Sequence, residues 1–284
     1  MATISWRARS LKAALRSALE DSGMSRREVA TQLNVSHTKV IRWMSDDWPA
    51  PSEADTASVL VCINVTGDER DRVLSIARAA DADWMVSGPP GINPQLASVL
   101  EVERYAVRIF EWGPLVWPGL LQSSDYARAV IARSGDLTDI EAEARVMMRI
   151  ARRDALTRAK PVELTAVVGL PAVQGKIGGA TVMADQLSHV GTVIGLDNIT
   201  IQVLDLSGDW TPGHPGAFIL YEFADMPPAV YLEHYRSGAF LVDEADVAAY
   251  QGAAETLRRE AMSPPATARL IADAIPNSSL ETTG

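Results

Sequence analysis

The chain has 284 residues, of which 47% are hydrophobic and 22% are charged, and its formal net charge is −10. This composition is ordinary for a globular protein of about two domains, so it excludes a fibrous or largely disordered chain. A single cysteine, Cys62, excludes an intramolecular disulfide and a cysteine-based zinc cluster, and it fits a reducing compartment. The N-terminal residues lack the apolar core of a signal peptide, and no run of about 20 apolar residues occurs. We therefore expect a cytoplasmic protein that does not enter a membrane.

The charge is unevenly distributed along the chain. Residues 5–45 contain eight lysines and arginines but only three acids, a local charge of +5, so the remainder carries −15. Charges more than about 10 Å apart are screened at moderate salt, and a basic segment can therefore attract phosphate although the whole chain is acidic. The acidic remainder is expected to weaken non-specific DNA binding, or to face a basic partner.

Residues 10–85 have the pattern of five short helices separated by tight breaks. Leu11, Leu15 and Leu19 form an apolar stripe at helical spacing that ends at Gly23. The capping box at residues 25–28 opens the second helix, and similar serine or threonine caps precede the later helices. The second and third helices are predicted to be short and close together.

A serine-, glycine- and proline-rich stretch marks the boundary to a second domain. Beyond it the pattern predicts helices over residues 94–112, 124–134, 138–159, 180–194 and 244–262, and a last helix from residue 263. Strands are predicted over 162–170, 199–206, 217–223, 229–235 and 239–242, the last three with the alternation of antiparallel pairs.

The expected fold class is an all-α N-terminal helix-turn-helix domain of five helices, followed by an α+β domain with a small, mostly antiparallel sheet. The expected limits are residues 8–86 for the helix-turn-helix domain, 87–92 for a linker, 93–276 for a regulatory or partner-binding domain and 277–284 for a disordered tail.

Residues 26–43 meet the requirements of a helix-turn-helix. Two helices that cross closely need a small residue at the crossing, which Ala30 supplies. The sharp turn needs a residue that tolerates left-handed dihedrals, and Asn34 is such a residue. Val35, Val40 and Trp43 fall where the second helix must attach to the core.

The opposite face of that second helix carries hydrogen-bond donors. A recognition helix reads base edges in the major groove with its N-terminal residues, whereas arginines beside it position the protein on phosphates. The candidate DNA-binding residues are Arg26, Arg27, Ser36, His37, Thr38, Lys39, Ile41 and Arg42. The alternatives are an ordinary helical hairpin with a solvated basic face, or the same fold used to bind a protein.

Residues 11–80 resemble the helix-turn-helix of phage-repressor-type regulators. The resemblance rests on Ser25, on the pairs Val29-Ala30 and Leu33-Asn34, on Val35-Ser36 and on Val40-Ile41-Arg42. The chain departs from the family pattern at Arg26, where glutamine is common, and at Asn34, where glycine is common. The resemblance implies a homodimer that reads paired half-sites on double-stranded DNA.

The rest of the chain resembles the large actinobacterial group of antitoxin-like transcriptional regulators, which join such a module to a C-terminal domain of uncharacterised function. The resemblance rests on LEVERY at residues 100–105, VWPGLLQSSDYARA at 116–129, the arginines at 145, 149, 152 and 153, ITIQVL at 199–204 and GHPG at 213–216. It implies a regulator of development or secondary metabolism, often encoded beside a small partner protein.

The C-terminal domain offers a candidate site for a partner or effector. The loop at residues 112–121 holds two tryptophans among glycine and proline breaks, so it either lines a pocket or fills the core. The candidate residues are Glu103, Arg104, Tyr105, Trp112, Trp117, Tyr126 and Arg149. Three alternatives are open for these residues. They line one hollow, they pair with each other on helix surfaces, or they bind a partner protein that adds a strand or buries its aromatic residues.

Enzyme chemistry is not indicated. The four histidines lack metal-ligand spacing, and the glycines at residues 175–179 fit neither a dinucleotide fingerprint nor a phosphate loop. We expect no catalytic residues, no metal and no cofactor. The predicted function is a sequence-specific DNA-binding transcriptional regulator whose C-terminal domain controls DNA binding through a small partner protein or an unknown small-molecule effector. The alternative is an antitoxin-like module that sequesters a small cognate protein and binds DNA for autoregulation.

Overall fold

The computed structural model describes residues 6–45, 48–78, 85–86, 94–133, 137–224, 226–234 and 238–275. The chain divides into two compact units, Met1–Met85 with Asp225–Pro227 and Val86–Ala224 with Pro228–Gly284, called unit 1 and unit 2 below. The linker expected at residues 87–92 and the tail expected at 277–284 lie outside the described residues.

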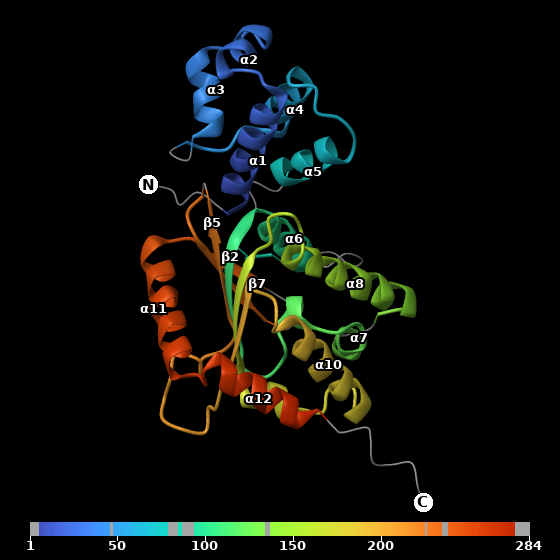
Figure 1. Ribbon diagram of the computed structural model, residues 1–284. Coiled ribbons are helices and arrows are strands. Elements are labelled where there is room, and N and C mark those ends of the chain that lie inside the picture. Colours follow the sequence, from blue (N-terminus) through green and yellow to red (C-terminus); the bar gives the residue numbers. More distant parts are fainter. Residues whose placement is uncertain are drawn as a thin grey trace, which may run out of the picture. The chain divides into compact units, whose positions relative to one another are not determined.

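Unit 1 is built from short helices (Figure 1). They are α1 (Trp6–Ser22), α2 (Arg26–Gln32), α3 (His37–Met44), α4 (Glu53–Cys62) and α5 (Gly67–Arg78). Helices α2 and α3, and likewise α4 and α5, are joined by turns of the same construction, in which Asn34 and Asn64 have φ angles of 52° and 59°. Asparagine tolerates this left-handed conformation better than most residues, which allows each helix to stop sharply and the chain to reverse.

The strands of unit 2 form one mixed sheet in the order β1-β7-β6-β5-β2-β3-β4. Their bounds are β1 (Met85–Val86), β2 (Ala106–Gly113), β3 (Glu163–Gly169), β4 (Ile199–Leu204), β5 (Phe218–Phe223), β6 (Ala229–Glu233) and β7 (Gly238–Leu241). Strand β2 pairs in parallel with β3, and β3 with β4, whereas β2–β5, β5–β6 and β6–β7 are antiparallel.

The expectation of a small, mostly antiparallel sheet is therefore wrong. The cause is β2, which the sequence pattern assigned to the end of a helix over residues 94–112. The helix α6 (Pro94–Tyr105) stops at Tyr105, and the next eight residues form an interior strand, which pairs with β5 on one side and β3 on the other. Parallel neighbours need long crossover connections, and here the segments that contain α8 and α10 provide them.

Helices cover both faces of the sheet in unit 2. Figure 1 shows α11 (Glu244–Glu260) beside one face, and α6, α7 (Ser124–Ile131), α8 (Asp139–Ala151) and α10 (Ala180–Val193) on the other side. The remaining elements are η1 (Gly119–Leu121), η2 (Arg152–Leu156), α9 (Leu170–Gln174) and α12 (Pro264–Ala274). Trp112, Phe218 and Leu257 belong to the core between the sheet and α11. Because side chains alternate along a strand, Glu111, Tyr221 and Tyr231 share the opposite face.

Candidate functional site

The exposed face of α3 in unit 1 is the first candidate site. The hydroxyl of Ser36 caps α3 by accepting the N–H of Lys39 at 3.2 Å, and the backbone N–H of Val35 donates to Ala30 at 3.0 Å across the turn. Val40 and Trp43 are buried, so the opposite face of the helix is left to solvent. An N-cap hydrogen bond of this kind stabilises a helix by about 1 kcal/mol, which matters in a helix of eight residues.

All the residues predicted to contact DNA are exposed in the structure. They are Arg26, Arg27, Ser36, His37, Thr38, Lys39, Ile41 and Arg42. Arg26 and Arg27 open α2, where Ser25 and Glu28 form a reciprocal capping box with distances of 3.3 and 2.7 Å. The side-chain oxygen of Ser36 is used by its cap, so this residue offers DNA less than its neighbours do.

Two cationic side chains on the exposed face of α3 contact other side chains of unit 1. The ammonium of Lys39 lies 3.2 Å from a carboxylate oxygen of Asp55 and 4.8 Å from the ring centre of Trp43. The guanidinium of Arg42 lies 4.0 Å over the ring of Trp48. Both cations remain on the surface, but a phosphate must compete with these contacts. Sequence patterns did not indicate these contacts, because Asp55 comes from the next helix, α4, and Trp48 from the loop that follows α3.

Two other basic residues of the +5 segment serve the fold instead. Lys12 is fully buried and its ammonium donates to the backbone oxygen of Trp48. Arg16 donates to the carbonyl of Met44 at 2.8 Å, at the C-terminal end of α3. A cation at this end of a helix is favoured by the helix dipole. The charge available to a phosphate is thus smaller than the sequence count indicates.

The second candidate site is a cluster of buried and partly buried polar side chains in unit 2, called the buried cluster below. Its members are Glu103, Glu111, Arg149, Arg152, Tyr221 and Tyr231. Arg152 makes a bidentate ion pair with Glu103, with distances of 2.6 and 2.9 Å, and the two side chains are only 6% and 4% exposed. Breaking such a pair leaves an uncompensated charge in a dry environment.

The charges of the buried cluster shift one another's pKa values. Burial, together with the negative charge of Glu103, raises the pKa of the Glu111 carboxyl to about 7, although Arg152 opposes the shift. Burial, together with the positive charge of Arg152, lowers the pKa of Arg149. Burial lowers the pKa of Arg152, but the adjacent carboxylate of Glu103 overcomes this effect and the pKa is raised.

Several donors of this cluster have no hydrogen-bond partner among the described residues. They are the hydroxyls of Tyr221 and Tyr231 and the Nε of Arg149. Burial raises the pKa of both tyrosines, so the hydroxyls keep their protons. A buried polar group without a partner costs about 1–3 kcal/mol, so these donors lower the stability of the folded protein.

The loop at residues 112–121, called the tryptophan loop below, fills the core beside this cluster. Trp117 is 1% exposed, and its backbone N–H donates to the hydroxyl of Tyr126 at 3.3 Å. Gln122 donates to the carbonyl of Trp117 at 2.6 Å and accepts from Arg149 at 3.1 Å. Gly119 allows the loop to approach the ion pair, because a Cβ there would lie 2.7 Å from Nη1 of Arg152.

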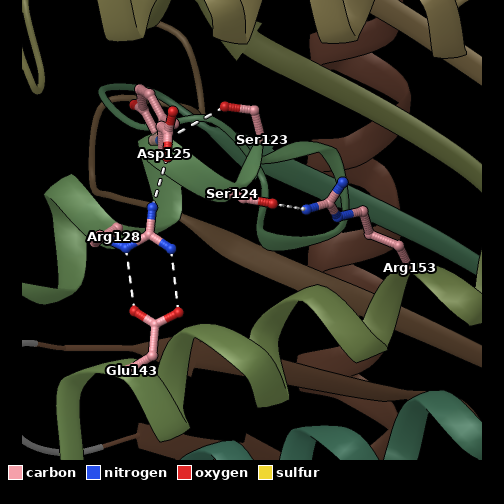
Figure 2. Close-up of polar contacts among 7 residues, drawn as sticks. Ser123, Ser124, Asp125, Arg128, Glu143 and Arg153 are labelled. Atoms are coloured by element: carbon pink, nitrogen blue, oxygen red, sulfur yellow. Dashed lines mark hydrogen bonds and ion pairs between the residues drawn. The ribbon is translucent and has the colours of Figure 1, made fainter. Parts of the chain in front are cut away.

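The polar residues that follow this loop join α7 to α8 and η2 (Figure 2). Arg128 lies between Asp125, at 2.5 Å, and Glu143 on α8, which it meets with two bonds of 3.1 Å. Arg153 donates to the hydroxyl of Ser124 at 3.1 Å. The motif at residues 116–129 therefore links α7 to α8 and η2 within unit 2.

Of the residues predicted for a partner or effector site, the structure brings Glu103, Trp117, Tyr126 and Arg149 together around the buried cluster. Arg104 is exposed and Tyr105 is partly buried. Trp112 lies on the other face of the sheet, where its indole N–H donates to Gly213 at 2.9 Å.

Glu111, Tyr221 and Tyr231 were not among the predicted site residues, although a lone acid within an apolar strand is a sequence signal for Glu111.

Among the described residues, no group of three or more histidine, cysteine or acidic side chains is placed to hold a metal ion. In the same part of the chain, no helix combines the length and the apolar character needed to cross a bilayer.

The chain belongs to a family that is described as a domain of unknown function, DUF5753, which matches residues 96–273. This match covers most of unit 2, including the buried cluster and the tryptophan loop. No curated protein and no solved structure matches the chain.

Proposed function

We propose that the protein is a sequence-specific DNA-binding transcriptional regulator, a homodimer that reads paired half-sites on double-stranded DNA with α3. The observation that carries the proposal is the exposed polar face of α3, held by the Ser36 cap and by the buried Val40 and Trp43. A short helix attached in this way can enter a major groove while the preceding helix crosses the backbone.

The proposed contacts divide into two kinds. His37, Thr38 and Lys39 lie in the first turn of α3, which is the part of a recognition helix that reaches base edges, and Ile41 offers an apolar contact to a thymine methyl. Arg26, Arg27 and Arg42 surround this turn and serve as phosphate contacts, which fix position but not sequence.

In this proposal, unit 2 controls when DNA is bound, through a small partner protein or a small-molecule effector. Helix α8 supports a protein partner, because Ile140 and Met147, which are two turns apart on it, are 84% and 61% exposed. Apolar side chains gathered on a surface are typical of protein contacts. The same observation favours the second candidate function, an antitoxin-like module that sequesters a small cognate protein.

The DNA-binding proposal is tested with the region upstream of the protein's own gene in a mobility-shift assay with non-specific competitor. The double variant Lys39→Ala/Arg42→Ala removes both cations of the α3 face. Each lost base or phosphate contact weakens binding by about 1–3 kcal/mol, so we expect an affinity loss of tenfold or more.

Arg78→Ala is the matched control, because it removes an exposed arginine from α5 of the same unit. The control should bind as the wild type does. Binding that the double variant leaves unchanged, or a wild type that does not bind this region, would contradict the proposal. The second candidate function is tested by co-purification with the product of the neighbouring gene, and a protein that never retains that product argues against it.

A further inference from the structure

A pocket of about 270 Å³ lies in unit 2, on the side of the sheet that α11 covers. The loop between β4 and β5, the end of β6 and the middle of α11 form its walls. The lining residues used below are Trp210, Phe218, Glu233, Ala249 and Tyr250. The GHPG motif at residues 213–216 supplies part of the loop wall through Pro215 and Gly216.

The loop wall of the pocket is held in place by its own hydrogen bonds. The N–H of Thr211 donates to Nδ1 of His214 at 3.0 Å, and the N–H of His214 donates to the carbonyl of Thr211 at 3.0 Å. Gly213 packs on Trp112, because a Cβ at this glycine would lie 2.8 Å from the indole ring. His214 is therefore a turn residue, and the wall is formed before any ligand arrives, which lowers the entropic cost of binding.

Aromatic rings dominate the interior of the pocket. Phe218 and Tyr250 meet edge to face with ring centres 4.9 Å apart. Trp210 is 71% exposed at the mouth, an unusual position for the largest apolar side chain. Prolines at 212 and 215 add flat apolar surface. Such walls favour a flat molecule that stacks on rings.

The charges of the lining residues further restrict which ligands can bind. The described residues that line the pocket include no lysine or arginine, and the ionisable groups among them belong to Glu233, His234 and Tyr250. Glu233 alternates with Leu232 along β6, so its side chain leaves the strand on the face of Tyr231, away from the pocket. An anion would therefore lose its hydration without gaining a lysine or arginine partner, whereas an organic cation gains from the faces of the rings.

We propose that this pocket binds a small planar aromatic molecule that is uncharged or positively charged. The proposal goes beyond the function proposed above, since it concerns unit 2 alone and does not require DNA binding. Pocket size, ring-lined walls and a few polar groups at the mouth are the usual features of small-molecule sites.

The test is ligand-observed NMR on the full-length protein with three probes of similar size: indole, benzyltrimethylammonium and benzoate. We expect saturable binding of indole and benzyltrimethylammonium, and at least tenfold weaker binding of benzoate. No saturable binding of either indole or benzyltrimethylammonium, or the tightest binding by benzoate, would overturn the proposal.

A filling variant locates the binding site. Ala249→Leu places a larger side chain at an exposed lining position of α11, and it should abolish binding of both favoured probes. Gln251→Leu is the matched control, because it adds the same side chain two residues away on the exposed surface of that helix. Trp210→Ala, on the surface loop, is a second pocket variant that leaves α11 intact and should also weaken binding. Equal binding by the wild type and both pocket variants would show that the probes bind elsewhere and would contradict the assignment.

Discussion

The arginines proposed to bind DNA in unit 1 and the arginine of the buried ion pair in unit 2 have opposite environments. In unit 1, Arg26 and Arg27 of α2 and Arg42 of α3 are exposed, and Arg42 lies over a tryptophan ring of its own unit. In unit 2, Arg152 is buried and engaged by a carboxylate. Exposed guanidinium groups remain available to phosphate, whereas the buried one fixes how α6 and η2 pack. The comparison teaches that a count of basic residues says little about binding until their burial is known.

The largest effect should follow from breaking the buried ion pair. Glu103→Ala leaves Arg152 charged and buried without its partner, so we expect it to lower the free energy of unfolding by about 3–5 kcal/mol. Urea denaturation of the full chain measures the change.

The control is Glu222→Ala, which breaks the more exposed pair with Arg108 and should cost at most about 1 kcal/mol. Equal losses in the two variants would show that the burial of the Glu103–Arg152 pair has no energetic consequence.

The next effect depends on pH and concerns Glu111. Its pKa is about 7 in the folded protein and near the ordinary value of 4.5 in the unfolded chain. The unfolded chain therefore loses its proton first as the pH rises, and stability falls between pH 4.5 and about 7 by about 1.4 kcal/mol for each pH unit.

Glu111→Gln should remove this slope and should be more stable than the wild type at pH 8. Denaturation of both proteins at several values between pH 5 and pH 8 gives the difference. A difference in stability that does not change with pH would contradict the account of this carboxyl.

A smaller effect is expected at Gly119. A Cβ there would meet the Arg152 guanidinium, which is held by Glu103 and cannot move freely, so Gly119→Ala should destabilise the protein by about 1–3 kcal/mol. Thermal unfolding measures the change. Gly208→Ala is the control, because nothing lies within 4 Å of its added Cβ, and it should be neutral or slightly stabilising. A Gly119→Ala variant as stable as the control would show that the loop adjusts without cost.

The smallest effect concerns the α3 face. Asp55→Asn removes the carboxylate that pairs with Lys39, and a surface pair of this kind is worth about 0.2–1 kcal/mol. DNA should therefore bind up to about fivefold more tightly to the variant, as fluorescence anisotropy would measure. Glu53→Gln, in the same turn of α4, is the control and should change affinity less. Weaker binding by Asp55→Asn than by the control would mean that the pair positions Lys39 for DNA.

Local sequence signals predicted much of unit 1. The caps at Ser25 and Ser36, the left-handed Asn34 and the apolar spacing of α1 depend on neighbours within a few residues. The same reasoning failed at β2, because the apolar pattern of α6 continues into Ala106–Gly113 and the choice of strand depends on pairing with β3 and β5. Whether neighbouring strands are parallel or antiparallel likewise depends on the connections between them, and the alternation of apolar and polar residues does not show it.

The buried cluster shows the same limit. Glu103 and Arg152 are separated by 49 positions, and nothing in either segment indicates that they meet. Tyr221 and Tyr231 arrive from antiparallel strands whose register the sequence does not supply. The chemistry of single residues could be anticipated, whereas their convergence required the sheet order.

The most direct test of the central claim, that α3 reads DNA sequence, is the ratio of affinities for the protein's own upstream region and for a scrambled duplex at one salt concentration. We predict a ratio of about 10³ or more for the wild type. His37→Ala/Thr38→Ala should lower this ratio, whereas Arg26→Ala should weaken both affinities equally. A wild type that does not distinguish the two duplexes, or a ratio unchanged by His37→Ala/Thr38→Ala, would contradict the account.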